Sequence, residues 1–235
     1  MVWLSASVVA QEPVAGEDTG EWAGDVNPAG RISGRFESDG DWIPVPMGSG
    51  GDIVYALVQD GSRIYAGGGF TTLGTQTVNR VAAWDGASWS PLGSGFGNSV
   101  RAMVLQGGKL YAGGDFTNAG GRAANRLAKW NGSGWTNLGA GVDGRVYSLA
   151  HDGTNLYAGG YFTNAGGRVA NRIAKWNGTT WTNLGAGLNY DVLSLVRGGN
   201  RFFLADTSTT EGGALAERGA RWNGSAWTNL GAGLG

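Results

Sequence analysis

The stretch Trp130–Gly141, WNGSGWTNLGAG, occurs four times along this chain in closely related forms. It returns as WNGTTWTNLGAG from Trp176 and as WNGSAWTNLGAG from Trp222, and a looser copy, WDGASWSPLGSG, begins at Trp84. The second tryptophan of each copy recurs every 46 residues, at Trp89, Trp135, Trp181 and Trp227. A fixed period of this length is typical of a solenoid or a propeller.

Each repeat reads as four short strands. The first is an alternating segment, VYALV, VRAMV, VYSLA or VLSLV, which begins at Val54, Val100, Val146 and Val192. The second strand carries YAGG in three repeats, the third resembles RLAKW, and the fourth resembles WTNL. No repeat contains a helical pattern of useful length. Four antiparallel strands in about 40–50 residues are the signature of a propeller blade.

The repeated stretch itself predicts a hairpin. Asn131 and Gly132 form its tip, where a positive φ is needed. The four intervening residues place Trp130 opposite Trp135, and such a cross-strand aromatic pair stabilises a hairpin by about 0.2–1 kcal/mol. The paired glycines of YAGG allow close backbone approach where strands converge.

The first fifty residues contain a decayed copy of the repeat. Trp22 aligns with Tyr111 and Trp42 with Trp135, so strands two to four are expected there, without a first strand. We therefore expect an all-β propeller of five blades, the first degenerate. After an N-terminal segment, 1–19, unit one is 20–53, unit two 54–99, unit three 100–145, unit four 146–191 and unit five 192–235.

The apolar run Val2–Ala10 has two interpretations. VVA before Gln11 resembles a signal-peptidase site, although no basic residue precedes the run. Alternatively the run is a β-strand, and its assembly residues would be Val2, Trp3, Leu4, Val8 and Val9.

As a strand, this run could supply the missing first strand of unit one. It could do so within its own molecule, which gives a closed monomer, or in a neighbour, which gives strand exchange and filaments. A third possibility is that the sequence is a fragment of a larger propeller.

The composition argues against several classes of function. Seventeen basic and eighteen acidic residues leave a net charge of −1, which disfavours a general nucleic-acid or polybasic membrane-binding surface. There is no cysteine, and the single histidine, His151, rules out a multi-histidine metal site within one chain. No apolar run approaches the roughly 18 residues of a membrane helix. We expect neither a metal nor a cofactor.

The repeated YAGGxF, ANRxAxWNG and WTNLGAG motifs resemble those of the kelch-like and Rax2- and delta-60-like repeat propellers of secreted and cell-surface bacterial proteins. The resemblance covers about residues 20–235. It implies a β-propeller and a secreted or cell-surface location, and it implies little about activity.

Three motifs invite a chemical interpretation that their context disfavours. Gly139, Gly141 and Gly144 spell GxGxxG, but a strand follows where a dinucleotide site needs a helix. His151 lies beside a hairpin turn without a nucleophile motif, so we expect a surface turn residue. One arginine recurs in each unit and is expected to bind backbone or a carboxylate between units: Arg80, Arg126, Arg172 and Arg218.

The loops that join one unit to the next break the repeat and form a candidate binding face, although drift in unselected loops explains their variation equally well. Its residues are Asp52, Asn98, Asp143, Arg145, Asn189, Tyr190 and Asp191. Unit five also departs from the repeat at ADTSTTEGG, which marks a seam or a contact. Candidate glycosylation sites lie in NGS or NGT sequons, at Asn131, Asn177 and Asn223.

We expect a non-enzymatic, extracellular or cell-surface scaffold that self-assembles into filaments by N-terminal strand exchange. Its expected partners are copies of itself or an extracellular protein or glycan. One alternative is an adhesin that binds carbohydrate or protein through the inter-unit loops. A second is a polysaccharide hydrolase or lyase with catalytic residues scattered over several units.

Overall fold

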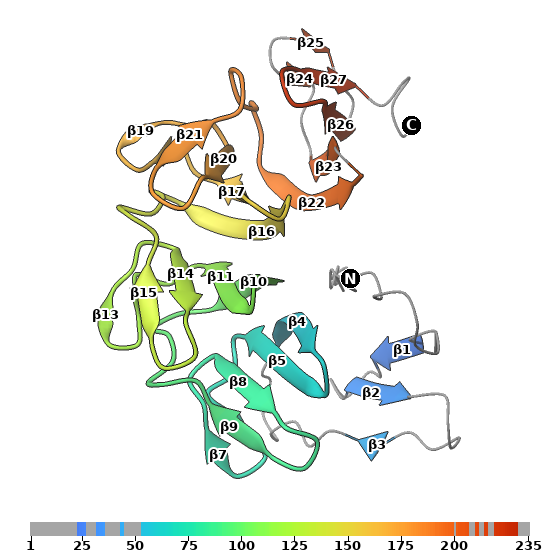
Figure 1. Ribbon diagram of the computed structural model, residues 1–235, viewed down its shortest axis with the longest axis vertical. Coiled ribbons are helices and arrows are strands. Elements are labelled where there is room, and N and C mark those ends of the chain that lie inside the picture. Colours follow the sequence, from blue (N-terminus) through green and yellow to red (C-terminus); the bar gives the residue numbers. More distant parts are fainter. Residues whose placement is uncertain are drawn as a thin grey trace.

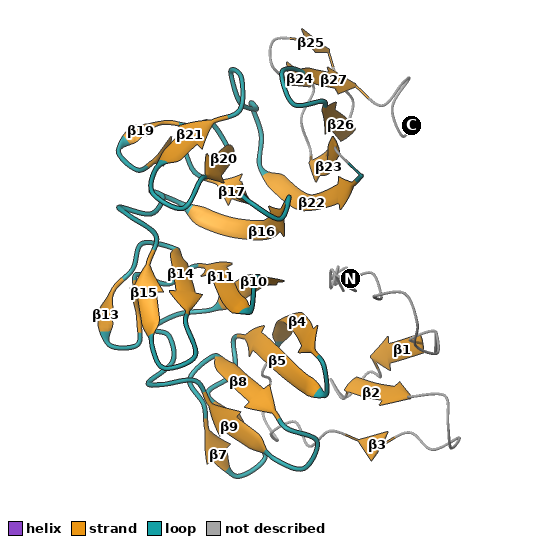
Figure 2. Ribbon diagram, in the orientation of Figure 1, coloured by secondary structure: helices purple, strands orange, loops and turns teal. Residues whose placement is uncertain are grey.

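The computed structural model describes residues 53–199, 201–206 and 219–229, together with five further short strands. These strands are Ala23–Val26, Ile32–Arg35, Ile43–Pro44, Thr210–Glu211 and Ala214–Leu215. The described residues form strands, turns and connecting loops without any helix, and so contain no helix that could cross a membrane (Figure 2).

Units two to five each form a four-stranded antiparallel sheet in which the strands follow one another in chain order. Unit two contains β4 (Val54–Asp60), β5 (Arg63–Gly68), β8 (Val81–Trp84) and β9 (Trp89–Pro91). Unit three contains β10 (Val100–Gln106), β11 (Lys109–Gly114), β14 (Leu127–Trp130) and β15 (Trp135–Asn137). Unit four contains β16 (Arg145–His151), β17 (Leu156–Tyr161), β20 (Ile173–Trp176) and β21 (Trp181–Asn183). Unit five contains β22 (Val192–Gly198), β23 (Arg201–Asp206), β26 (Gly219–Trp222) and β27 (Trp227–Asn229).

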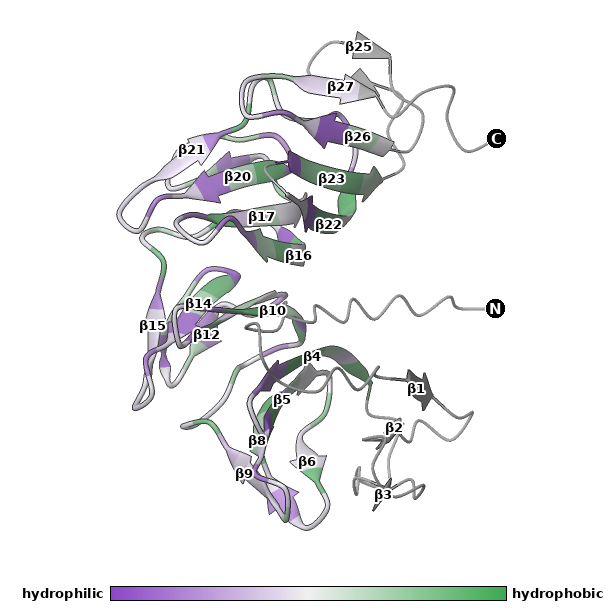
Figure 3. Cartoon of the chain, turned by 45° about the vertical axis from the view of Figure 1, so that its right-hand side comes forward, coloured by the Kyte–Doolittle hydropathy of each residue, from purple (hydrophilic) through white to green (hydrophobic). Residues whose placement is uncertain are grey.

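The four sheets follow one another along an arc (Figure 1). The first strands β4, β10, β16 and β22 lie on its inner side, where each contacts the next, and the fourth strands lie outside. Hydrophobic residues colour much of β4 and β10, whereas β9 and β15 are paler or hydrophilic (Figure 3). This all-β repeat confirms the predicted class and has a propeller-like arrangement. Closure into a ring and the number of blades stay predictions.

The loop between strands two and three contains a small hairpin that the sequence analysis did not predict. These hairpins are β6–β7 (Thr72–Leu73, Gln76–Thr77), β12–β13 (Asn118–Ala119, Arg122–Ala123), β18–β19 (Asn164–Ala165, Arg168–Val169) and β24–β25 (Thr210–Glu211, Ala214–Leu215). Isolated bridges tie two of them to the loop that arrives from the preceding unit, through Phe96 with Ala119 and Val142 with Ala165. In units three and four the longest loop therefore helps to join neighbouring units.

The predicted tryptophan hairpins are present in units two to five. Trp130 lies directly opposite Trp135 in the β14–β15 register, and the four tryptophan pairs have ring centroids 5.2–5.5 Å apart. Gly132 has the positive φ expected at the tip, 99°. Asn131 stabilises the turn through its side chain, whose Oδ1 accepts hydrogen bonds from the N–H groups of Ser133 and Gly134.

The YAGG glycines permit the close approach that the sequence predicted. A Cβ on Gly113 would lie 2.6 Å from Cγ1 of Val146, which belongs to the inner strand of the next unit. A Cβ on Gly114 would meet the backbone oxygen of Ser99, where the β10–β11 register shifts at a bulge. The first glycine therefore lets neighbouring sheets pack together, and the second lets the inner strand bend.

The outer tryptophan of a unit also binds the unit before it. Nε1 of Trp135 donates to the carbonyl of Leu92 at 3.0 Å, and Nε1 of Trp181 donates to Leu138 at 2.8 Å. Trp227 donates in the same way to Leu184 at 3.0 Å. Neighbouring units are therefore joined twice. The buried indole hydrogen bonds join their outer edges, and the glycine contacts join them on the inner side.

Unit one contains β1 (Ala23–Val26), β2 (Ile32–Arg35) and β3 (Ile43–Pro44). They form a three-stranded antiparallel sheet in the order β1-β2-β3. The candidate assembly residues Val2, Trp3, Leu4, Val8 and Val9 lie outside the described residues.

The tryptophan hydrogen bonds can be tested with a matched pair of variants. Trp181→Phe removes the donor to Leu138, whereas Trp89→Phe removes a buried Nε1 that has no hydrogen-bond partner among the described residues. We expect Trp181→Phe to lower the free energy of unfolding by about 1–3 kcal/mol more than Trp89→Phe, because a buried acceptor that loses its donor stays desolvated. Urea unfolding measures both losses, and equal losses would contradict a stabilising role for the indole bond.

Candidate ligand-binding surface at the inner strands

The strand order separates the candidate residues between the two ends of the sheets. In a four-stranded antiparallel sheet the turns 1–2 and 3–4 share one end, and the 2–3 and inter-unit loops share the other. Asn131, Asn177 and Asn223 therefore lie at the first end, where all three are exposed. At the second end lie Asn98, Asp143, Arg145, Asn189, Tyr190 and Asp191; Asp52 lies outside the described residues.

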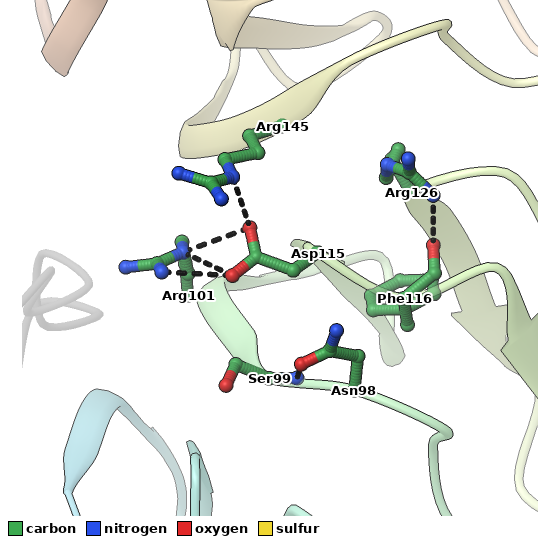
Figure 4. Close-up of polar contacts among 7 residues, drawn as sticks. All are labelled: Asn98, Ser99, Arg101, Asp115, Phe116, Arg126 and Arg145. Atoms are coloured by element: carbon green, nitrogen blue, oxygen red, sulfur yellow. Dashed lines mark hydrogen bonds and ion pairs between the residues drawn. The ribbon is translucent and has the colours of Figure 1, made fainter.

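A carboxylate at this second end binds two arginines from neighbouring units (Figure 4). Asp115 follows β11, and Nε of Arg101 donates to both of its oxygens at 2.9 Å, while Nη2 lies 2.7 Å from Oδ2. Nε of Arg145, at the start of β16, lies 3.6 Å from Oδ1. The hydrogen bonds to Asp115 raise the pKa of Arg101 above its usual value. Asp115 thus links the inner strands of units three and four.

Two tyrosines flank the Arg101 guanidinium. Its Cζ lies 4.9 Å from the ring centroid of Tyr55 and 5.6 Å from that of Tyr147. These residues occupy the same second position of VYALV, VRAMV and VYSLA, on three adjacent inner strands. Contacts of this length are cation–π interactions. In unit five the position holds Leu193, which is exposed.

A second group of this kind joins units four and five. The Cζ atom of Arg172 lies 4.9 Å from the ring centroid of Tyr161, and its Nε lies 3.4 Å from Oδ1 of Asp191. Burial raises the pKa of Asp191, and the positive charge of Arg172 opposes that rise.

The two groups adjoin, because Tyr161 is the direct cross-strand partner of Arg145. We call the combined set the inner-strand surface: Tyr55, Arg101, Asp115, Arg145, Tyr147, Tyr161, Arg172 and Asp191.

Two predicted binding residues, Asp143 and Asn98, make hydrogen bonds within the chain. The Asp143 carboxylate accepts hydrogen bonds from the N–H and hydroxyl of Thr163 and from the N–H and side-chain amide of Asn164, at 2.7–2.9 Å. Burial acts to raise the pKa of Asp143, but these hydrogen bonds outweigh it and lower the pKa to about 2. Asn98 uses its Oδ1 to accept from the N–H of Ser99. Asp143 therefore ties its loop to the loop that follows β17, whereas Asn98 orders its own loop.

Asn189 and Tyr190 are exposed, but no printed contact links either of them to this surface. Of the predicted residues that the structure describes, Arg145 and Asp191 belong to the inner-strand surface. Sequence analysis missed Tyr55, Arg101, Asp115, Tyr147 and Tyr161. The signal was present, because the repeats differ at these positions: AGGGF, AGGDF and AGGYF place Gly69, Asp115 and Tyr161 at equivalent sites.

Where they are described, the recurring arginines bind backbone carbonyls, as predicted, but two of these bonds lie within one unit rather than between units. Nη1 of Arg126 donates to the carbonyl of Phe116 and Nη1 of Arg172 to that of Phe162, while Arg80 reaches across to Phe96 of the next loop. All three have a φ of 64–71°, a conformation that is uncommon for residues other than glycine. Arg218 lies outside the described residues.

The remaining motifs also have structural roles. His151 ends β16 beside a turn, and its Nδ1 accepts a hydrogen bond from the N–H of Gly153. Burial and then the charge of Arg197 lower its pKa. The GxGxxG glycines precede β16, which is a strand, as expected. Within the described ranges no three histidine, cysteine or carboxylate side chains gather as a metal site.

A cleft of about 390 Å³ lies between units three and four at the same end of the sheets. Its walls include Asn125, Arg126, Gly141, Asp143 and Asn164. Asn125 and Arg126 recur in the neighbouring units as part of the repeated framework. The cleft therefore offers less individual chemistry than the inner-strand surface.

No family model and no curated protein matches this chain. Among solved structures, the chain is similar to the crystal structure of the computationally designed Ika8 protein, with a TM-score of 0.56 and 14% sequence identity. The match covers 86% of this chain and 54% of the designed one, so the chain spans about half the length of that protein. This likeness concerns the fold alone.

The ordering role of Asp143 predicts a dependence of stability on pH. Its pKa in the folded chain, about 2, lies below the value of about 3.9 in an unfolded chain. The contribution of the Asp143 carboxylate to the free energy of unfolding is therefore complete above about pH 4 and is lost as the pH falls toward 2. We expect Asp143→Asn to be less stable than the wild type at pH 7, with a gap that narrows at pH 2.5. Urea midpoints measure the gap, and Asp60→Asn, at an exposed position, is the control.

Proposed function

We propose that this chain is a non-enzymatic interaction module, secreted or held at the cell surface, whose inner-strand surface binds an acidic saccharide. The observation that carries the proposal is the contrast between a repeated backbone and unrepeated side chains. Tyr55, Arg101 and Tyr147 occupy one equivalent position, and Arg145 and Asp191 occupy another. Rigid scaffolds commonly carry binding residues at the ends of their strands in this way.

The exposed part of the surface favours an acidic sugar. The Arg145 side chain is 58% exposed and has only a long contact to Asp115, so most of its donors face solvent. Tyr161, beside it, is 54% exposed. A guanidinium pairs well with a carboxylate, and an aromatic ring packs against the apolar face of a sugar. Three arginines against two aspartates leave the inner-strand surface with a net positive charge.

The pairing of the carboxylates supports binding rather than catalysis. Asp115 and Asp191 are each engaged in an ion pair with an arginine, so neither carboxylate faces a ligand unpaired. A glycoside hydrolase needs one carboxylic acid that can give up a proton to the leaving group. The hydrolase or lyase alternative predicts shortened products after incubation with polysaccharide, which size-exclusion chromatography detects.

Binding can be measured by isothermal titration with oligogalacturonate, using neutral dextran oligosaccharides as the uncharged comparison. We expect oligogalacturonate to bind the wild-type chain. Arg145→Ala should weaken the binding affinity about tenfold, which is equivalent to about 1.4 kcal/mol. The matched control is Arg168→Ala, because Arg168 is exposed on the β18–β19 hairpin outside the inner-strand surface. Equal weakening by both variants, or equal binding of both sugars, would contradict a specific site at Arg145.

A further inference from the structure

Unit five has an uncovered face where the other units are covered. The fifth residue of the inner strand packs against the following unit: Val104, for example, packs in one cluster with Leu149 and Leu156. The equivalent residues Val58, Val104 and Ala150 are 6%, 3% and 7% exposed, whereas Val196 of β22 is 52% exposed. In the described structure no following unit covers Val196.

The described strands of unit one do not include one that would provide such a cover. The sheets of units two to five begin with an inner strand, but in unit one the order is β1-β2-β3, and β1 aligns with a second strand. In the described structure β1 pairs only with β2. One additional inner strand would therefore complete unit one and cover unit five. The described parts of these two units lie at the two ends of the arc (Figure 1).

Residues 5–9, SASVV, match the inner-strand pattern at three of its positions. Ser7 aligns with a small third residue, Ala56, Ala102, Ser148 or Ser194. Val8 aligns with the apolar fourth residue, Leu57, Met103, Leu149 or Leu195, and Val9 with the fifth. At the first position, Ser5 replaces a valine that is present in the other four units.

The replacement at Ser5 has a matching change in unit five. Gly67, Gly113 and Gly159 lie so close to the first valine of the next unit that an added Cβ would be 2.5–2.7 Å from its Cγ1 atom. The equivalent residue of unit five is Ala205, which pairs with Ser194 as Gly159 pairs with Ser148. Ala205 is exposed, whereas the three glycines are buried. A serine, with one γ atom where valine has two, leaves more room for the extra methyl group.

A hydrogen-bonding group is also in place. Oγ of Ser148 accepts the N–H of Leu195, the fourth residue of the next inner strand, at 2.9 Å in a buried position. Ser194 occupies the same position one unit later. The corresponding donor in SASVV would be the N–H of Val8.

We infer that residues 5–9 dock on the β22–β23 face of their own chain as the missing inner strand of unit one. Ser5 packs on Ala205, and Val8 packs on Val196. Residues 10–22 connect this strand to β1, and a flexible linker of that length spans about 20 Å on average. Such a linker gives an effective concentration in the millimolar range, so at micromolar concentrations the chain's own segment outcompetes a neighbour's.

Disulfide trapping tests this docking, because the chain contains no cysteine of its own. The full chain with Val8→Cys and Val196→Cys is oxidised at 1 µM and examined by non-reducing electrophoresis and mass spectrometry. We expect an intramolecular disulfide in a monomer. The control pair is Val8→Cys with Val169→Cys, in which Val169 is 67% exposed on β19. This pair should form little intramolecular disulfide. Covalent dimers, no disulfide, or a mature protein that begins at Gln11 would each overturn the inference.

A second test examines the register of the docked strand. It uses the pair Ala205 and Ser5, which stands where the other units have a glycine and a valine. In the cysteine pair, Ser5→Val should lower the yield of disulfide, because its extra methyl group meets the Ala205 side chain. Adding Ala205→Gly should restore the yield, because it recreates the glycine site of the other units. A yield that Ser5→Val leaves unchanged, or that Ala205→Gly does not restore, would show that this register is wrong.

Discussion

The packing of this protein depends on the contact between a glycine of one unit and a valine of the next. At Gly113 and Val146 the two sheets are closer than any side chain on the glycine would allow. The contact recurs at Gly67 and at Gly159, so units two to five are set against one another in the same way. At the outer edge, the indole hydrogen bond of Trp181 to Leu138 provides a second attachment. Two contacts far apart on one sheet restrict both its spacing and its tilt.

This repeated framework leaves the ends of the inner strands free to vary. The position that holds Tyr55 in unit two holds Arg101 in unit three and Leu193 in unit five. This difference between units alters no glycine–valine contact and no tryptophan hydrogen bond. Charged and aromatic residues can therefore gather there without loss of the fold. Stability and recognition thus use different residues of each unit, which explains why the most regular motifs carry the least information about a ligand.

Sequence reasoning succeeded where an element depends on local contacts. The Trp130–Trp135 pair and the positive φ of Gly132 arise within six residues of chain, and both were predicted. The small β12–β13 hairpin was missed, because Asn118–Ala123 has little strand character and its bridge partner, Phe96, belongs to the preceding loop. Asp143 was assigned to a binding face because its loop varies, but its hydrogen bonds to Asn164 were not visible in the sequence.

The sequence by itself determined the period, the four-stranded unit, the turns and the glycines, because each follows from residue spacing and backbone conformation. Only the tertiary structure decided that Asp115 binds Arg101 and Arg145, since these side chains meet when two sheets pack side by side. It also decided that no described unit covers Val196, although a similar sequence buries Val104. Burial depends on which sheet comes next in space, and four nearly equal repeats are not equivalent once one of them lies at an end.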